Sequence, residues 1–65
     1  MKLKIGEVKL LMVEQNLTQD ELAEKADLSR ISISYFMNGK NASVKSINKI
    51  ANALNVSIRD IVEMN

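Results

Sequence analysis

The residues best suited to chemistry in this chain lie between Arg30 and Asn38. At helical spacing one side of that stretch is apolar, and the other side carries Ile31, Ser34, Tyr35 and Asn38. An ordinary solvated helix mixes lysine with glutamate on its outer side, whereas the only charge here is an arginine at the start. Such a side is suited to a partner that offers hydrogen bonds.

Two helices must position this side, and the stretch Thr18–Gly39 predicts both. Thr18 and Glu21 have the spacing of a capping box, which starts a first helix. Ser29 is a good N-cap for a second helix, and Asn38-Gly39 ends it. Small and apolar residues fall on the inner faces of the two helices, at Leu22, Ala23, Ala26, Ile33, Phe36 and Met37. The pattern predicts a helix-turn-helix whose second helix enters a DNA major groove.

The text LTQDELAEKADLS followed by ISYFMNGK resembles the helix-turn-helix of phage-repressor-like regulators, the xenobiotic-response-element family. The matching positions in this motif are Leu17, Thr18, Gln19, Leu22, Ala23, Ser29, Ile33, Ser34 and Gly39. The downstream text also fits, at Ser43, Ile47, Lys49, Ile50, Ala51, Leu54, Val56 and Ser57. The resemblance implies an all-α, five-helix, lambda-repressor-like DNA-binding domain that acts as a transcriptional regulator, most often a repressor.

The resemblance also implies which residues contact DNA. Gln19 matches a family glutamine that bonds a backbone phosphate, and Arg30 matches a position that faces the groove, where it would bond guanine or a phosphate. Ile31 would touch a thymine methyl group. The full set of candidate DNA-binding residues is Thr18, Gln19, Ser29, Arg30, Ile31, Ser32, Ser34, Tyr35, Asn38, Lys40, Asn41, Ser43 and Lys45. For Tyr35 the alternative is core packing beside Phe36.

The chain departs from the family pattern at four positions. Asp27 stands where the family usually has glycine, so we expect Asp27 to adopt a positive φ. Met12 and Met37 stand where many relatives carry a partly buried Arg–Glu pair, and we expect the two methionines to touch in the core. Ala42 stands where relatives often have proline.

The remaining segments predict three further helices and no sheet. Ile5–Asn16 is apolar on more than one face, because Leu10 and Val13 lie off its main stripe. Ser43 begins a helix with an apolar stripe at Ile47, Ile50, Ala51 and Leu54. Ser57 and Asp60 have capping-box spacing for a short last helix. We expect part of its apolar set, which is Ile58, Ile61, Val62 and Met64, to meet a second chain.

Composition narrows the class of protein. The 65 residues suit one small domain, which we expect to span residues 1–65, and the 46% hydrophobic content can supply a core. With no cysteine and no histidine, the chain can form neither a disulfide nor a thiolate zinc site, and it lacks the commonest general base. The opening MKLKIGEVKL is too short and too charged for a signal peptide or membrane span. We expect a cytoplasmic, nucleoid-associated protein.

Charge is polarised along the chain. Glu14–Asp27 holds five acidic residues and one lysine, a net charge of −4. Leu28–Arg59 holds five basic residues and no acidic one, a net charge of +5. A basic surface on one side is the electrostatic signature of a nucleic-acid binder, although clustering by chance is the alternative in so small a protein.

The sequence predicts no enzyme and no cofactor or metal. Asp20, Glu21 and Glu24 lie close together, but at the start of a helix such residues are usually solvated and interact favourably with the helix dipole. They also lack the spacing of a calcium loop, and there is no glycine-rich phosphate loop.

Two functional hypotheses follow. The first is a regulator that binds double-stranded DNA as a homodimer on a twofold operator, with a protein effector as a candidate partner. The second is a protein-interaction module of the same fold, such as an antitoxin or an anti-repressor partner. The basic second half favours the first. If apolar Leu10, Val13 and Ile58 are exposed, they keep the second hypothesis open, although they could equally form the interface of a homodimer.

Overall fold

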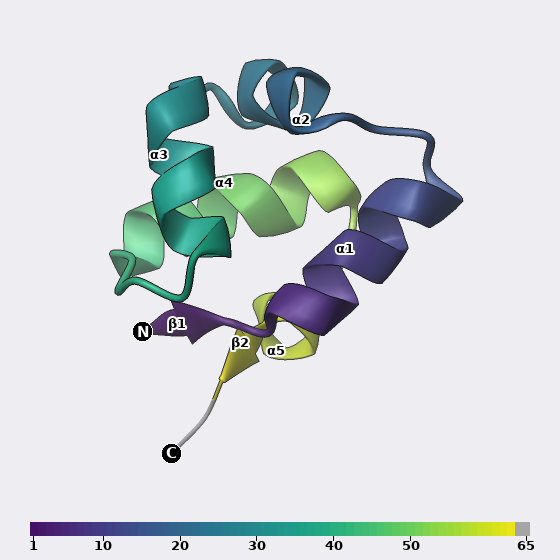
Figure 1. Ribbon diagram of the computed structural model, residues 1–65. Coiled ribbons are helices and arrows are strands. Elements are labelled where there is room, and N and C mark those ends of the chain that lie inside the picture. Colours follow the sequence, from purple (N-terminus) through teal and green to yellow (C-terminus); the bar gives the residue numbers. More distant parts are fainter. Residues whose placement is uncertain (64–65) are drawn as a thin grey trace.

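Five helices and one pair of very short strands make up the computed structural model, which describes residues 1–63. The helices are joined by short loops, and the first and last elements meet at one end of the molecule (Figure 1). In chain order the elements are β1 (Lys2–Leu3), α1 (Ile5–Glu14), α2 (Gln19–Ala26), α3 (Arg30–Met37), α4 (Val44–Leu54), α5 (Ile58–Ile61) and β2 (Val62–Glu63).

Four helices begin at a hydroxyl side chain that caps the helix. The Thr18 hydroxyl accepts a hydrogen bond from the Glu21 N–H at 3.1 Å, and the Glu21 carboxylate accepts one from the Thr18 N–H at 2.9 Å. This reciprocal capping box confirms the predicted start of α2. The predicted caps Ser29, Ser43 and Ser57 are also confirmed, because each hydroxyl accepts a hydrogen bond from a backbone N–H at the start of α3, α4 or α5, and at α5 the Asp60 carboxylate completes a capping box.

Three helices are followed, at or just after the C-cap, by a residue in the left-handed conformation. Asn16, Asp27 and Asn55 have φ values of 56°, 57° and 59°. In each case the N–H of the next residue reaches back five positions to a helix carbonyl, from Leu17 to Met12, Leu28 to Ala23 and Val56 to Ala51. Each of these next residues is apolar and packs on the core, as in a Schellman motif. The positive φ expected at Asp27 is therefore confirmed.

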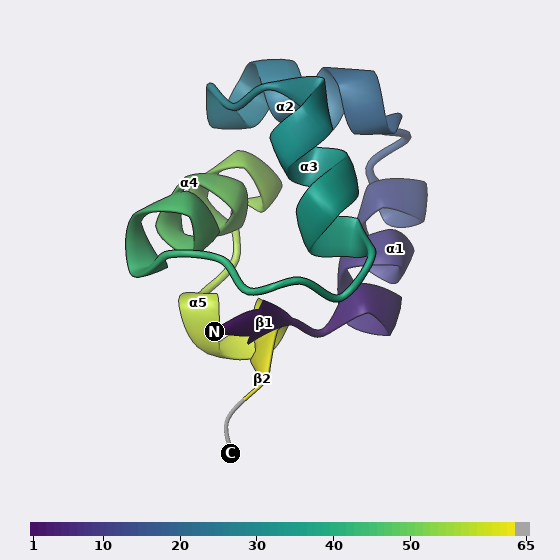
Figure 2. The same cartoon turned by 60° about the vertical axis from the view of Figure 1, so that its left-hand side comes forward.

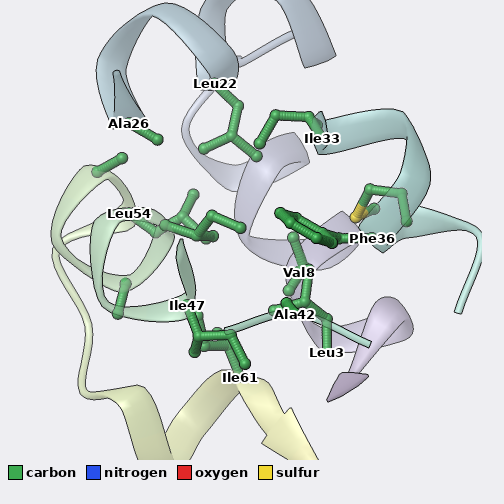
Figure 3. Packing of buried hydrophobic residues seen from close by; sticks show 14 of the residues in the cluster. Leu3, Val8, Leu22, Ala26, Ile33, Phe36, Ala42, Ile47, Leu54 and Ile61 are labelled. Atoms are coloured by element: carbon green, nitrogen blue, oxygen red, sulfur yellow. The ribbon is translucent and has the colours of Figure 1, made fainter. Parts of the chain in front are cut away.

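The core lies between α4 and the helices around it. In Figure 3 the side chains of Leu22 from α2, Ile33 from α3 and Leu54 from α4 converge on one interior. The predicted stripe of α4 is confirmed, with Ile47, Ile50 and Leu54 fully buried. The Gln15 side-chain amide donates to the Leu54 carbonyl at 2.8 Å and so joins the ends of α1 and α4.

Met12 and Met37 are both buried, with 7% and 8% of their surface exposed. Each belongs to the same hydrophobic cluster, so neither points into solvent. Two apolar side chains thus occupy the positions where many relatives carry an ion pair, without leaving a buried charge. Their direct contact stays a prediction.

The expectation of no sheet is wrong. β1 pairs antiparallel with β2, with Lys2 opposite Glu63 and Leu3 opposite Val62. The Lys4 N–H continues this contact by donating to the Ile61 carbonyl at 2.7 Å. Strands of two residues are too short to show an alternating pattern in the sequence, which explains the error.

Much of the last apolar segment is buried within the chain itself, and whether any of it meets a second chain stays a prediction. Ile61 and Val62 are 0% and 1% exposed, and Ile58 is half-buried against the core. Pairing with β1 turns Val62 inward beside Leu3. Met64, the other member of that set, lies outside the described residues.

The loop after α3 is held by the start of the chain. The Ala42 N–H donates to the Met1 carbonyl at 2.6 Å, and the Ala42 side chain is buried. Proline has no N–H, so it could not make this bond at a position where relatives often carry it. Among the described residues, no helix is long and apolar enough to cross a membrane.

Candidate nucleic-acid interface

The inner and outer sides of α3 differ sharply in burial. Ile33, Phe36 and Met37 are buried, as predicted, whereas Ile31 is 82% exposed and Tyr35 is 54% exposed. The Tyr35 ring packs edge-to-face on Phe36, with 6.0 Å between ring centroids, but remains outside the core. In Figure 2, α3 lies at the near face of the molecule. The structure thus presents the polar and apolar outer side of α3 to solvent.

A shallow depression of about 390 Å³ follows this outer side. Its lining residues are Ile31, Ser34, Tyr35, Asn38 and Lys40, all of them predicted site residues. Two apolar side chains, one lysine and several hydrogen-bonding groups therefore share one surface. No acidic side chain lines it, so its electrostatics suit a negatively charged partner.

Internal hydrogen bonds hold several of these polar groups. The Ser29 hydroxyl accepts from the Ser32 N–H and donates to the Ser32 hydroxyl, both at 3.0 Å. The Asn38 side-chain amide donates to the Ser34 carbonyl at 2.7 Å. Ser29 and Asn38 thus stabilise the two ends of α3, and the carboxamide oxygen of Asn38 still has capacity to accept a hydrogen bond.

The first turn of α2 lies against the start of α3. Gln19 is half-buried as the first residue of α2, and the Thr18 hydroxyl before it is occupied by the cap. Arg30 forms an ion pair with Asp20, with 2.8 Å between the Arg30 Nε and the Asp20 carboxylate. Asp20 was absent from the predicted site, because it was assigned to a solvated acidic cluster. Its opposite charge to Arg30 was the only signal in the sequence, and that signal gives no distance.

The loop and the start of α4 complete the predicted set. Lys40 and Asn41 are exposed in the loop, and Lys45 is exposed in the first turn of α4. The Ser43 hydroxyl caps α4 by accepting from the Ser46 N–H at 3.1 Å. Gly39 adopts φ 85°, a conformation that L side chains rarely adopt, and so turns the chain out of α3.

The basic residues of the second half are not equally available. Lys49 lies 4.0 Å from the Asp27 carboxylate, and Arg30 is paired with Asp20. Within residues 1–63, Lys40 and Lys45 have no ion-pair partner. Lys40 lines the depression and Lys45 is exposed in the first turn of α4, so both charges are available to a phosphate.

A family model described as helix-turn-helix matches residues 8–61, from the first turns of α1 to the end of α5. The chain belongs to the phage-repressor-like helix-turn-helix family. Membership confirms the resemblance seen in the sequence and assigns the chain to DNA-binding helix-turn-helix regulators, a family that is typically not enzymatic. No curated protein is detectably similar to the chain.

In this phage-repressor-like protein, α2 and α3 are the two helices of the motif, and they contact each other directly. The family match covers every predicted site residue, although it does not test which of them touches DNA. Among residues 1–63, no group of three or more histidine, cysteine or acidic side chains is arranged to hold a metal ion.

Proposed function

We propose that the protein is a sequence-specific transcriptional regulator, acting as a repressor, that places α3 in the major groove of DNA. The observation that supports this most is the depression along α3, where exposed Ile31 and Tyr35 lie beside hydrogen-bonding groups and a lysine. Base edges in the major groove offer hydrogen bonds and thymine methyl groups, which this combination suits. The protein then works in the compartment that holds the DNA, the cytoplasm of a bacterial cell.

The predicted residues divide into two roles. Gln19, at the start of α2, and Lys40 bond phosphates, which fixes the docking angle without selecting a sequence. Asn41 and Lys45 extend the phosphate contacts along the loop and α4. Ile31, Ser34 and Tyr35 face the groove or its rim and select the sequence. Because all five helices contribute to one hydrophobic cluster, we treat residues 1–65 as a single DNA-binding domain.

A gel-shift experiment against random genomic fragments at low salt tests this proposal. Non-specific affinity for the phosphate backbone should appear without knowledge of the operator, and it should fall steeply as salt is raised. Selection of bound sites from a random DNA pool should then recover a preferred sequence. A folded protein that retains no fragment at low salt would contradict the proposal.

We further propose that two copies bind a twofold operator, because one short recognition helix makes few base contacts. Leu10 and Val13 on α1 are 54% and 74% exposed, and we propose that they form the dimer interface. Sedimentation at tens of micromolar should show a dimer, at least when operator DNA is present. Monomer alone under both conditions would count against this arrangement.

The same two side chains favour a second candidate function, a protein-interaction module such as an antitoxin or an anti-repressor partner. Apolar side chains that lie next to each other on a surface helix are typical of protein contacts. The gel shift separates the two functions, because a module of that kind has no need of the salt-dependent affinity for random DNA.

A further inference from the structure

An acidic residue at the start of α2 holds the arginine at the start of α3. Asp20 is the second residue of α2 and Arg30 is the first residue of α3. The Arg30 Nε lies 2.8 Å from a carboxylate oxygen of Asp20, and both side chains remain largely exposed, at 65% and 72%. The contact therefore directs the guanidinium group at the point where α3 begins, without burying it.

The atom that Asp20 engages decides what the guanidinium can still do. A guanidinium group has five N–H donors in a planar fork, one of them on Nε and four on the two terminal nitrogens. Guanine offers two adjacent acceptors, O6 and N7, in the major groove. With Nε held by Asp20, the two terminal nitrogens remain to donate two parallel hydrogen bonds to these acceptors.

We infer that Asp20 is a positioning residue that makes Arg30 a reader of guanine, an inference that rests on the proposed function. Without Asp20 the long arginine side chain is free to turn to a phosphate, which every sequence offers. With Asp20 the guanidinium is directed and partly neutralised, so its interaction with phosphates weakens relative to its interaction with guanine. Asp20 therefore exchanges non-specific attraction for selectivity.

The contact has little other purpose in the free protein. An ion pair this exposed contributes little to stability. Asp20 also lies in the first turn of α2, where a carboxylate interacts favourably with the helix dipole, but Glu21 in the same turn already supplies that interaction. A helix-stabilising role would affect unfolding and leave the preference among bases unchanged, so the two roles predict different results.

The test begins with the guanine that Arg30 reads. Site selection with the wild-type protein and with Arg30→Ala should differ at one guanine position. Affinities are then measured for the selected site, for the same site with adenine at that position, and for random DNA. Asp20→Ala should lower the ratio of guanine-site to adenine-site affinity by on the order of tenfold, while affinity for random DNA holds or rises. Circular dichroism checks that the helices are retained.

Two comparisons make the result specific. Glu24→Ala removes an exposed carboxylate from the same helix, and it should shift both affinities equally and keep their ratio. In an Arg30→Ala background, Asp20→Ala should no longer change the ratio, because the side chain that it positions is gone.

The inference is overturned if Asp20→Ala keeps the ratio as Glu24→Ala does, or if Arg30→Ala changes no guanine preference. Failure of the proposed function gives a different result, in which the wild-type protein retains no random DNA at low salt.

Discussion

An isoleucine that is 82% exposed near the start of α3 gains little stability from burial in the free protein. Ile31 lies on the side of α3 opposite the buried Ile33, and it lines the depression together with Lys40. The proposed docking gives the two side chains different tasks, in which Ile31 would touch a base and Lys40 would meet a phosphate. This difference can be measured.

Ile31→Ala should relax the preference at one base position. In the proposed docking, the change would remove an apolar contact to a thymine methyl group that contributes about 1 kcal/mol of discrimination. An uncharged side chain releases no counterions when it binds, so the dependence of affinity on salt should not change. Affinities for the selected site and for its single-base variants, measured over a range of salt concentrations, check both expectations.

Lys40→Ala should weaken binding to every sequence by a similar factor and lower the salt slope by about one unit. It serves as the matched comparison for Ile31→Ala, because both side chains line the same depression. If Ile31→Ala leaves the preferred site and its affinity unchanged while Lys40→Ala weakens binding, α3 docks in a different orientation from the proposed one.

The left-handed residue at the end of α2 predicts an effect on stability. Asp27→Ala should lower the free energy of unfolding by about 1 kcal/mol more than Asp27→Gly does, because a Cβ atom is unfavourable at φ 57° and alanine has no polar side chain to compensate. Both changes remove the carboxylate near Lys49. The difference between their free energies of unfolding therefore reports the cost of the backbone conformation alone. Urea denaturation measures it, and a loss of several kcal/mol in the glycine variant would contradict this account.

At the scale of one element, α5 depends on its cap more than the longer helices do. It has four residues. The Ser57 hydroxyl accepts a hydrogen bond from the Arg59 N–H, and the Asp60 carboxylate accepts one from the Ser57 N–H. A helix this short is unstable alone and forms because the cap and the burial of Ile61 support it. Its position in turn places β2 against β1.

Ser57→Ala should therefore lower the free energy of unfolding by about 1 kcal/mol, as is usual for loss of an N-cap. Ser57→Asp keeps an oxygen that can accept the same hydrogen bond, and it should retain most of the stability. Thermal denaturation of both variants checks this. Equal losses would show that the cap is not what holds α5.

At the scale of the whole molecule, the two ends of the chain close the core together. Leu3 of β1 is 1% exposed and pairs with Val62 of β2, while the Met1 carbonyl accepts from the loop after α3. The start of the chain thus contacts both the last strand and the loop that carries Lys40. Stability and the placement of that loop are linked through this region.

Leu3→Ala should lower the free energy of unfolding by about 2–3 kcal/mol, since it leaves a cavity at a fully buried position. In a domain of this size such a loss is a large part of the total stability. Lys2→Ala changes the exposed neighbour in the same strand and should have little effect. A Leu3→Ala variant as stable as Lys2→Ala in urea would show that the strand pair is not part of the core.

Local signals in the sequence were sufficient to predict the helices and the helix-turn-helix. The caps at Thr18, Ser29, Ser43 and Ser57 join residues two or three positions apart, and the left-handed end at Asp27 depends on one residue and its neighbours. The helical period also predicted which side of α3 is exposed. These features depend on short-range geometry, which residue order alone determines.

The tertiary structure alone decided the features that join distant parts of the chain. The pairing of β1 with β2, the burial of Ile61 and Val62 and the contact of Asp20 with Arg30 leave no periodic pattern in the sequence. Whether an apolar residue near the chain end is buried depends on which segment folds over it. Whether two opposite charges meet depends on the angle between their helices. The packing of the whole chain decides both the burial and the ion pair, because residues far apart in sequence come within contact distance only in the folded molecule.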